Sequence, residues 1–474
     1  MRQLSPRDAA FLDADNAHAN ANLTFVQIYD QGTAPGGSVR FKAILAHIES
    51  RLQRWPLFRH RLLQVPLGLD EPYWVEDAHF DLEYHVRHIA LPAPGDWRQF
   101  CIQASRIHAR ALDLDRPLWE IYVIEGLDSI TDLPPGSFAL LTKIHHAAIP
   151  IETRNEVIEV LHDGRRRPPR PPPPRPWFPE RAPGGVELLG RSLVHCALAP
   201  QRLLRPLARL RAGASTFAHN LLHADHETAI RFNSVVSPHR VFDTRRFGVD
   251  EFDAIRRLVP GASIDDAVLA VCAGGLRAYL EAQGELPPAD LNALTLRAGE
   301  AVTVSLATSI ADPVERLRWI QAGSEGTAAS ATPQADRPLA AFSLTPVAGP
   351  QRPVYLAGAR LVYYSAILPI ADGLGLAFAV TRYDGRIVIS PTSCRELMPD
   401  PEAFTQCVRD CFQDYLARAT GRAAAPVQPL PLKPAAPGAS ASGRRRPAAP
   451  KPRKAASPLR LVPGGQRRST ARPR

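Results

Sequence analysis

Two adjacent histidines, His145 and His146, are the residues of this chain best suited to acid–base chemistry. They stand in the stretch LLTKIHHAAIPIETRNEV, residues 140–157, between a run typical of a buried strand and a run typical of a helix. Side chains alternate between the faces of a strand, so His146 would share one face with Ile144 while His145 shares the other with Lys143. Only one imidazole can therefore face a given pocket. A histidine near a strand end is also a common structural residue, so the pair alone does not indicate catalysis.

Other kinds of site lack the residues that they need. The six cysteines are scattered without a CxxC pair or metal-ligand spacing, which predicts neither a zinc site nor a disulfide framework. No run of 18 uncharged apolar residues occurs, and the first residues lack the charged and apolar segments of a signal peptide. We expect a protein of the cytoplasm, with reduced structural thiols and no bound metal.

Composition divides the chain of 474 residues into five parts. A Pro/Arg-rich linker covers residues 163–185, where proline density excludes helix and sheet. It separates a first half, 1–162, from an amphipathic helical connection at 186–226 and a second half at 227–418. The basic tail, 419–474, holds 13 of the 57 Lys and Arg residues and none of the 47 Asp and Glu residues, so the folded halves are nearly neutral. The composition of the tail predicts disorder.

Two of these parts make a lipid surface a candidate partner. The connection places leucines on one side and arginines on the other, which is typical of a helix in a lipid interface. Pro200 and Pro206 favour the alternative, a helix packed on its own protein. The tail could bind an anionic membrane or nucleic acid, or stay solvated. No folded recognition module accompanies it, so specific nucleic-acid binding is not predicted.

Periodicity predicts helices and strands in both halves, which indicates a mixed α/β fold. In the first half we expect helices at residues 42–55 and 97–111, and strands at 22–29, 119–125 and 138–146.

In the second half, GASIDDAVLAVCAGGLRAYLEAQG predicts the clearest helix, with Ser263 and Asp266 as a capping pair. The stretch that follows Gly358 predicts three strands separated by the turn signals ADG and YDG. A last helix is expected at residues 400–417.

Six stretches, in order and at compatible spacing, resemble the bacterial wax ester synthase/acyl-CoA:diacylglycerol acyltransferase family. They are LSPRDAAFL (4–12), FRHRLLQVPLGLDEPYWVEDAHFDLEYHVRH (58–88), RPLWEIYVIEGL (116–127), LLTKIHHA (140–147), RFNSVVSPHRVF (231–242) and PVYLAGARLV…PIADGLGL (353–376). The resemblance covers nearly all of residues 1–418. It implies an α/β fold of two chloramphenicol-acetyltransferase-like halves with a tunnel between them.

The resemblance also implies the reaction and its partners. A fatty acyl group would pass from acyl-CoA to a hydroxyl of diacylglycerol or of a long-chain alcohol, with no cofactor. Such substrates place the protein in the cytoplasm or at the surface of the inner membrane or of a lipid droplet.

In the family motif HHxxxDG the second histidine is the base, which assigns that role to His146 and leaves His145 to pack or orient. An imidazole that takes the proton of the attacking alcohol typically contributes about 100- to 10,000-fold in rate. Pro117, Leu118 and Trp119 match a family motif near the tunnel, although core packing explains a buried Trp119 equally well.

Four family landmarks are altered, among them an asparagine-containing turn that reads TPVAGP here, with Pro346 and Ala348 in place of the expected residues. The aspartate and glycine of the motif fall at Pro150 and Ile151, and an asparagine-aspartate pair that supports the site reads Asp265-Asp266. A proline-valine-serine-arginine strand has no counterpart at residues 291–304, so we expect a strand to be missing there. These changes keep a second hypothesis open, a catalytically impaired member of the family that binds acyl chains or lipid surfaces.

Overall fold

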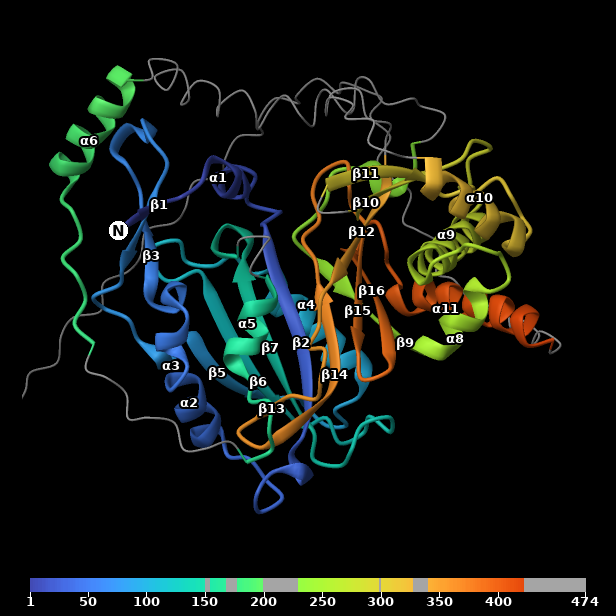
Figure 1. Ribbon diagram of the computed structural model, residues 1–474, viewed down its shortest axis with the longest axis horizontal. Helices are drawn as coiled ribbons and strands as arrows, with labels where there is room; N and C mark the ends of the chain where they lie inside the picture. The colour runs from blue at the N-terminus through green and yellow to red at the C-terminus, as the bar shows by residue number, and fades with distance from the viewer. Residues whose placement is uncertain (150–153, 168–176, 199–228, 298–299, 327–339, 422–474) are drawn as a thin grey trace, which may run out of the picture. The chain divides into compact units, whose positions relative to one another are not determined.

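Two large mixed sheets dominate the computed structural model (Figure 1), which describes residues 1–149, 154–167, 177–198, 229–297, 300–326 and 340–421. In these residues a six-stranded sheet has the order β13-β14-β2-β7-β6-β5, and a seven-stranded sheet has the order β11-β10-β12-β15-β16-β8, with β9 also paired to β16. Both sheets combine parallel and antiparallel pairs. The predicted α/β fold class is confirmed.

The six-stranded sheet carries the histidine pair at the end of a central strand. Strands β2 and β7 are buried along almost their whole length, polar residues such as Gln27 and Lys143 included, so neither shows the alternation of buried and exposed positions that a half-exposed strand has. The strands of this sheet are β2 (Asn22–Asp30), β5 (Val86–Ala90), β6 (Trp119–Glu125), β7 (Phe138–His145), β13 (Tyr355–Leu356) and β14 (Ala359–Ile367).

One long strand of this sheet comes from the second half of the chain. Strand β14 pairs antiparallel with β2, from Arg360 opposite Asp30 to Ile367 opposite Thr24. The boundaries expected at residues 162 and 227 therefore follow the order of the chain but do not separate the two sheets.

The seven-stranded sheet is built entirely from the second half. Its strands β15 and β16 form a hairpin whose turn residues Asp384 and Gly385 have φ angles of 49° and 72°, as a tight hairpin turn requires. The YDG turn signal is thereby confirmed. The strands are β8 (Arg240–Phe242), β9 (Arg245–Gly248), β10 (Asn292–Arg297), β11 (Glu300–Ser305), β12 (Ala340–Val347), β15 (Ala377–Tyr383) and β16 (Arg386–Cys394).

The strand that we expected to be missing is present. Strand β10 pairs antiparallel with β11 and parallel with β12. The expectation for residues 291–304 is wrong because the residues of the family motif are replaced, while the alternation of buried and partly exposed positions that is typical of a strand persists. Ala293 and Thr295 are buried, whereas Leu294 and Leu296 are partly exposed.

Helices α8 to α11 pack against one another beside the seven-stranded sheet (Figure 1). Helix α9 begins at the predicted capping pair, in which Ser263 and Asp266 bond each other's backbone N–H groups. Helix α4 packs against β8 and β2. The helices are α1 (Pro6–Asp13), α2 (Phe41–Glu49), α3 (Leu82–His85), α4 (Trp97–Ala109), α5 (Arg154–Leu161), α6 (Gly185–Leu198), α8 (Val249–Arg256), α9 (Ile264–Gln283), α10 (Pro313–Gly326) and α11 (Pro401–Thr420).

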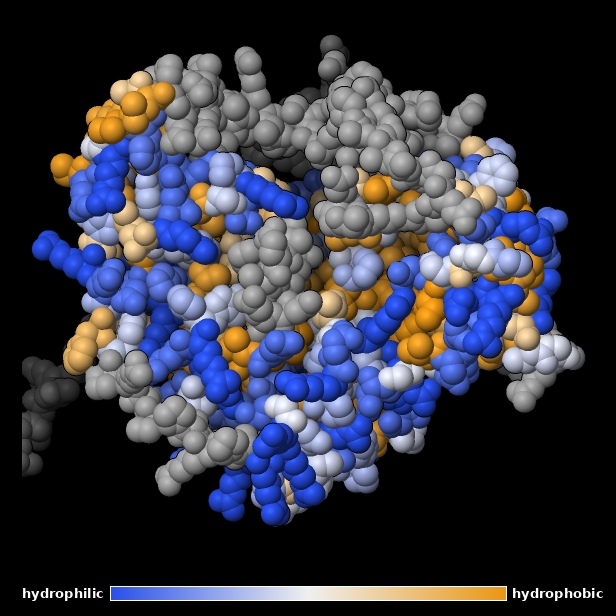
Figure 2. Space-filling view, viewed as in Figure 1, coloured by the Kyte–Doolittle hydropathy of each residue, from blue (hydrophilic) through white to orange (hydrophobic). Residues whose placement is uncertain are grey.

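A small third sheet carries α6, the described part of the predicted amphipathic connection. Strands β1 (Arg2–Gln3), β4 (Tyr73–Glu76) and β3 (His60–Leu63) form this sheet, and Leu188 of α6 packs into an apolar cluster beside it. The other side of α6 leaves apolar side chains exposed (Figure 2), namely Val186, Leu193, Val194 and Leu198.

The two large sheets meet where β14 contacts β15 and β16. The hydroxyls of Ser365 and Ser390 lie 2.6 Å apart, and the Thr381 hydroxyl donates to the Tyr364 carbonyl at 2.8 Å. These buried hydrogen bonds join the sheets side by side.

No helix in the described ranges is long and apolar enough to cross a membrane. The thiols of Cys101, Cys272, Cys394, Cys407 and Cys411 are free, and within the same ranges no group of three or more His, Cys, Asp or Glu side chains could hold a metal ion. The tail lies outside the described residues from residue 422 onward.

Candidate active site

The histidine pair spans the end of β7 and the start of a single 3-10 turn. Strand β7 ends at His145, and the turn covers His146–Ala148. The expected strand was one residue too long, so the alternation of faces applies to His145 but not to His146. The separation of the two imidazoles therefore arises from the turn and not from the pleat of the strand.

His145 is held through both ring nitrogens. Its Nδ1 accepts the backbone N–H of Ala147 at 3.1 Å, and its Nε2 lies 3.1 Å from Oδ2 of Asp15. Because Nδ1 accepts a hydrogen bond, the neutral ring carries its proton on Nε2 and donates it to the Asp15 carboxylate. The side chain is almost fully buried. This arrangement orients the ring and leaves neither nitrogen available for a substrate.

His146 is placed by its backbone and by an aromatic neighbour. Its N–H donates to the carbonyl of Ala21 at 2.9 Å. Its ring stacks on Phe11 of α1, with ring centroids 4.9 Å apart and an angle of 23° between the planes. Stacking of this kind fixes the plane of the imidazole.

The segment between α1 and β2 organises the turn. Asp15 accepts the N–H of Ala21 at 2.7 Å through Oδ1 while its other oxygen meets His145. The second half holds the same segment: Arg240 donates to the carbonyl of His18 at 2.8 Å, and Asp372 lies 3.1 Å from Nε2 of His18. The histidine turn thus lies at the junction of the two halves.

A third histidine, His108 near the C-terminal end of α4, lies close to the pair. Its Nδ1 forms a 2.9 Å hydrogen bond with the hydroxyl of Thr24. Burial, together with the nearby positive charges of Arg240 and Lys143, lowers the pKa of His108 to about 3, and the charge of His146 acts in the same direction. His108 is therefore neutral at physiological pH.

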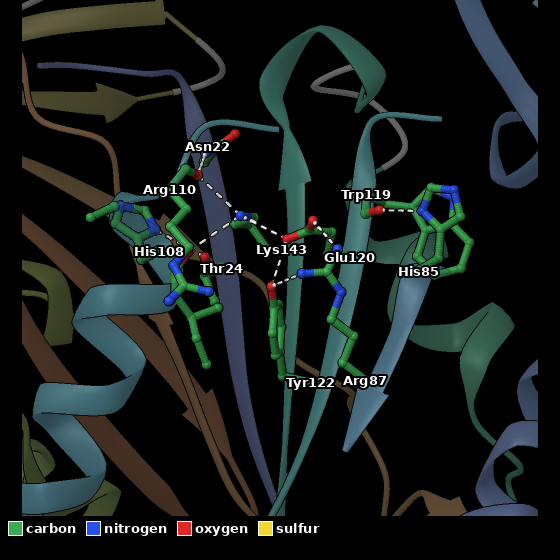
Figure 3. A network of polar contacts seen from close by, with 12 residues as sticks. Asn22, Thr24, His85, Arg87, His108, Arg110, Trp119, Glu120, Tyr122 and Lys143 are labelled. Atoms are coloured by element: carbon green, nitrogen blue, oxygen red, sulfur yellow. Dashed lines mark hydrogen bonds and ion pairs between the residues drawn. The ribbon is translucent and has the colours of Figure 1, made fainter. Parts of the chain in front are cut away.

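A buried ion pair supports this side of the sheet (Figure 3). Nζ of Lys143 lies 3.0 Å from Oε2 of Glu120, which stands opposite it on β6. Lys143 also donates to the carbonyls of Arg110 and Ile107, at 3.0 and 3.3 Å, and so caps the C-terminal end of α4. Burial lowers the pKa of Lys143, and the Glu120 carboxylate opposes that shift.

Glu120 has two further partners on its open side. The Tyr122 hydroxyl donates to it at 3.0 Å, and Nη2 of Arg87 lies 3.3 Å away (Figure 3). Arg87 in turn donates to the Tyr122 hydroxyl at 3.1 Å. The buried carboxylate is thus matched by several donors, which a buried charge requires.

The PLWE stretch, residues 117–120, supports the site through its backbone and through its packing. The carbonyl of Leu118 accepts the N–H of His145 at 3.0 Å. Trp119 is buried, donates from its indole to the carbonyl of Phe58 at 3.0 Å, and stacks on His85 at 4.5 Å between ring centroids. Pro117 forms an isolated bridge with Arg61. Trp119 therefore fits the packing alternative, while Leu118 positions the motif strand.

Asp266 belongs to α9. Its carboxylate accepts the N–H and hydroxyl of Ser263, at 2.9 and 2.7 Å. The capping prediction is confirmed, and the assignment of Asp266 as a support of the motif stays a prediction. Pro150 and Ile151, which replace the aspartate and glycine of the motif, lie outside the described residues.

Two cavities lie where the halves meet, beside α4. One of about 660 Å³ is lined by residues that include Trp97, Arg245 and Arg409, and one of about 450 Å³ by residues that include Trp97, Arg106 and Arg240. Neither is lined by His145 or His146. The tunnel implied by the resemblance stays a prediction.

Sequence reasoning missed five residues of this site, namely Phe11, Asp15, His108, and Lys143 with its partner Glu120. Lys143 and Glu120 had a signal, because each is a lone charge within an apolar strand run and such charges need a partner. Asp15 had none, since its partner His145 lies 130 residues away.

Comparison with known proteins gives consistent matches. The model of the wax ester synthase/diacylglycerol acyltransferase catalytic domain matches residues 4–268, and that of the C-terminal domain of the same family matches residues 324–415. A Mycobacterium tuberculosis (strain H37Rv) protein named as a diacylglycerol O-acyltransferase is 32% identical over 353 residues, with 69% of this chain and 72% of the relative covered. A second such protein from strain CDC 1551 is 29% identical, with 87% and 91% covered.

Two solved structures have the same fold. The wax ester synthase/diacylglycerol acyltransferase of Marinobacter aquaeolei VT8 superposes with a TM-score of 0.65 at 24% identity, covering 88% of this chain and all of that one. The first condensation domain of the calcium-dependent antibiotic synthetase gives a TM-score of 0.55 at 14% identity, with 90% and 97% covered. Both likenesses concern the fold.

Proposed function

Because the chain belongs to the wax ester synthase/diacylglycerol acyltransferase family, we propose that it transfers a long-chain acyl group from acyl-CoA to diacylglycerol, and also to long-chain alcohols, with His146 as the general base. The observation that carries the proposal is the pair of neighbouring imidazoles at the junction of the halves, one held at both nitrogens and the other stacked on an aromatic ring.

The reaction needs one proton acceptor. The alcohol oxygen attacks the thioester carbonyl while His146 takes its proton, the carbon–sulfur bond breaks, and the same proton passes to the departing thiolate to give free CoA. His145 and Asp15 act as positioning residues, since they fix the turn that presents His146. Phe11 fixes the plane of the ring.

The test is an assay of the full chain with radiolabelled palmitoyl-CoA and either dioleoylglycerol or hexadecanol. Loss of the base should reduce turnover by about 100-fold or more in His146→Ala. His145→Ala should lower thermal stability more than turnover, because His145 orients and does not take the proton. Equal loss of turnover in the two variants, both shown to be folded, would contradict the assignment of the base.

The alternative, an impaired relative that only binds acyl chains or lipid surfaces, rests on Pro150 and Ile151. It predicts that the folded chain binds palmitoyl-CoA without transferring the acyl group to either acceptor. The exposed apolar side chains of α6 support a lipid surface as a partner under both hypotheses.

A further inference from the structure

The loop between α1 and β2, residues 14–21, is closed by hydrogen bonds of its own side chains. Oδ1 of Asn16 accepts the N–H of His18 at 2.9 Å, and Oδ1 of Asp15 accepts the N–H of Ala21 at 2.7 Å. Side-chain bonds of this kind take the place of the backbone partners that a helix or a sheet would supply. The loop is therefore a compact unit, so a shift of one of its residues displaces the others.

Both histidines of the candidate site depend on this loop. Asp15 bonds the ring of His145. The carbonyl of Ala21 accepts the N–H of His146 at 2.9 Å. From the first half, Asn20 anchors the loop by donating to the last carbonyl of α4 at 3.1 Å. The position of the loop thus sets the position of both imidazoles.

Arg240 of β8 holds the loop from the second half, at the backbone of His18. Its Nη2 donates to the carbonyl of His18 at 2.8 Å, and its Nη1 donates to the carbonyl of Ser237. The side chain is buried, and among the described residues no carboxylate forms an ion pair with it. A buried charge is costly unless its donors are matched, and the carbonyl of His18 is one of the two groups that match this one. The contact between Arg240 and the loop is therefore expensive to break.

Asp372 holds the side chain of the same loop residue. Its carboxylate lies 3.1 Å from Nε2 of His18, and its Oδ1 also accepts the N–H of Val236 at 2.9 Å. The N–H of the next residue, Gly373, donates to the carbonyl of Ser234 at 3.1 Å. These bonds fix the carboxylate within the second half, so the imidazole of His18 is tied to that half as well.

We propose that His18, Arg240 and Asp372 form a clamp through which the second half of the chain positions His146 for acyl transfer. The inference rests on the proposed function, because it assumes that His146 is the base. The three residues do not touch the reacting atoms: the clamp acts on the loop, and the loop acts through its bonds to the histidine turn. Loss of a positioning residue of this kind should lower kcat and leave the KM for the acyl donor unchanged.

The first measurement determines kcat and KM for palmitoyl-CoA in the full chain, with dioleoylglycerol as the acceptor. Arg240→Met, Asp372→Ala and His18→Ala, the three clamp variants, should each lower kcat about tenfold and change KM by less than about twofold, because a catalytic group displaced by about 1 Å can lose up to about 100-fold in rate. Arg240→Lys and Asp372→Asn keep a donor and an acceptor at these positions and should recover part of the rate. A raised KM with unchanged kcat in Arg240→Met would overturn the clamp, because Arg240 also lines the smaller cavity and would then act on substrate binding.

The two side chains that meet at the loop give a second kinetic test. In His18→Ala the carboxylate of Asp372 has already lost the imidazole. Adding Asp372→Ala to that variant should therefore lower kcat less than Asp372→Ala does in wild type. Losses that multiply independently in the double variant would overturn the side-chain contact as part of the clamp.

Backbone hydrogen exchange reports on the histidine turn without relying on turnover. The N–H groups of Ala21 and His146 are both bonded within the loop and its contact with the turn, so peptides that contain them should exchange about tenfold faster in the three clamp variants than in wild type. Arg316→Met is the matched control. Arg316 is also a buried arginine that donates to two backbone carbonyls, those of Ile310 and Ala311, but it lies on α10. Its loss should leave exchange at the histidine turn unchanged.

The two kinds of measurement separate the clamp from the proposed function. Faster exchange at the histidine turn in the clamp variants alone supports the clamp even in a chain that transfers no acyl group, a result that would reject the proposed function. Unchanged exchange in all three variants, or the same increase in Arg316→Met, overturns the clamp whether or not the chain is active. Wild-type kcat in folded Arg240→Met and Asp372→Ala overturns it while leaving the proposed function standing.

Discussion

Substitution of Lys143 by methionine should destabilise the protein far more than the loss of a surface charge. Methionine keeps most of the volume of the side chain but removes the ammonium, and Glu120 stays 7% exposed beside an apolar strand. Removing one partner of a buried ion pair costs about 3–5 kcal/mol, because the other charge is left unmatched. The carbonyls of Ile107 and Arg110 lose their donor as well.

The remaining donors set the size of the effect. Arg87 and Tyr122 still contact Glu120 in the variant, so its carboxylate keeps two partners. We therefore expect Lys143→Met to lower the free energy of unfolding by about 3–4 kcal/mol and not by more. Removing the charge of Glu120 as well relieves the mismatch. The double variant Lys143→Met, Glu120→Gln should therefore be more stable than the sum of the single changes predicts, by about 1–3 kcal/mol.

The free energy of unfolding is measured in urea for wild type, both single variants and the double variant. Lys42→Met on the exposed side of α2 is the matched control and should change it by less than about 0.5 kcal/mol. A loss below about 1 kcal/mol in Lys143→Met, or strict additivity in the double variant, would refute the argument that the pair is desolvated and coupled.

Three further predictions concern the site and the surface. His108 in the folded protein stays neutral down to a pH of about 3, whereas in the unfolded chain it takes up a proton below a pH of about 6.5. The stability of the folded protein should therefore fall as the pH drops from 6.5 toward 5. The midpoint of thermal unfolding should fall less over that range in His108→Gln than in wild type. Asp15→Ala should lower acyl transfer about tenfold through a loosened histidine turn, whereas Asp128→Ala, in an exposed loop, should not; equal rates in both variants would reject the orienting role. Leu193→Asp on α6 should weaken co-sedimentation with phosphatidylglycerol vesicles more than Val235→Asp, another exposed apolar residue, and equal binding by the two would exclude α6 from the lipid contact.

Local signals in the sequence predicted the local structure well. Apolar runs gave β2, β6 and β7, the Ser263–Asp266 pair gave the start of α9, and the YDG turn gave the β15–β16 hairpin. Each depends on residues within a few positions of one another. The prediction of a missing strand at residues 291–304 was wrong because it depended on the residues of the family motif, whereas the alternation of side chains alone predicts a strand there.

The candidate site was only half predictable. The chemistry of His145 and His146 follows from their types and from the family resemblance, but their orientation depends on contacts across the fold. Asp15 and Phe11 reach the pair from the first helix and the segment after it, and Arg240 holds that segment from the other half. No periodicity in one chain reports such pairings, because they arise from tertiary packing.

The insertion of β14 beside β2 has a consequence for how the chain is synthesised. Strand β2 leaves the ribosome more than 300 residues before its neighbour β14 does, because it ends at Asp30 while β14 starts at Ala359. Until then its outer edge carries unpaired backbone N–H and C=O groups, which template aggregation. We therefore expect fragments that stop before residue 359 to need a chaperone or to precipitate, and a peptide spanning residues 353–370, supplied in trans, to rescue their solubility.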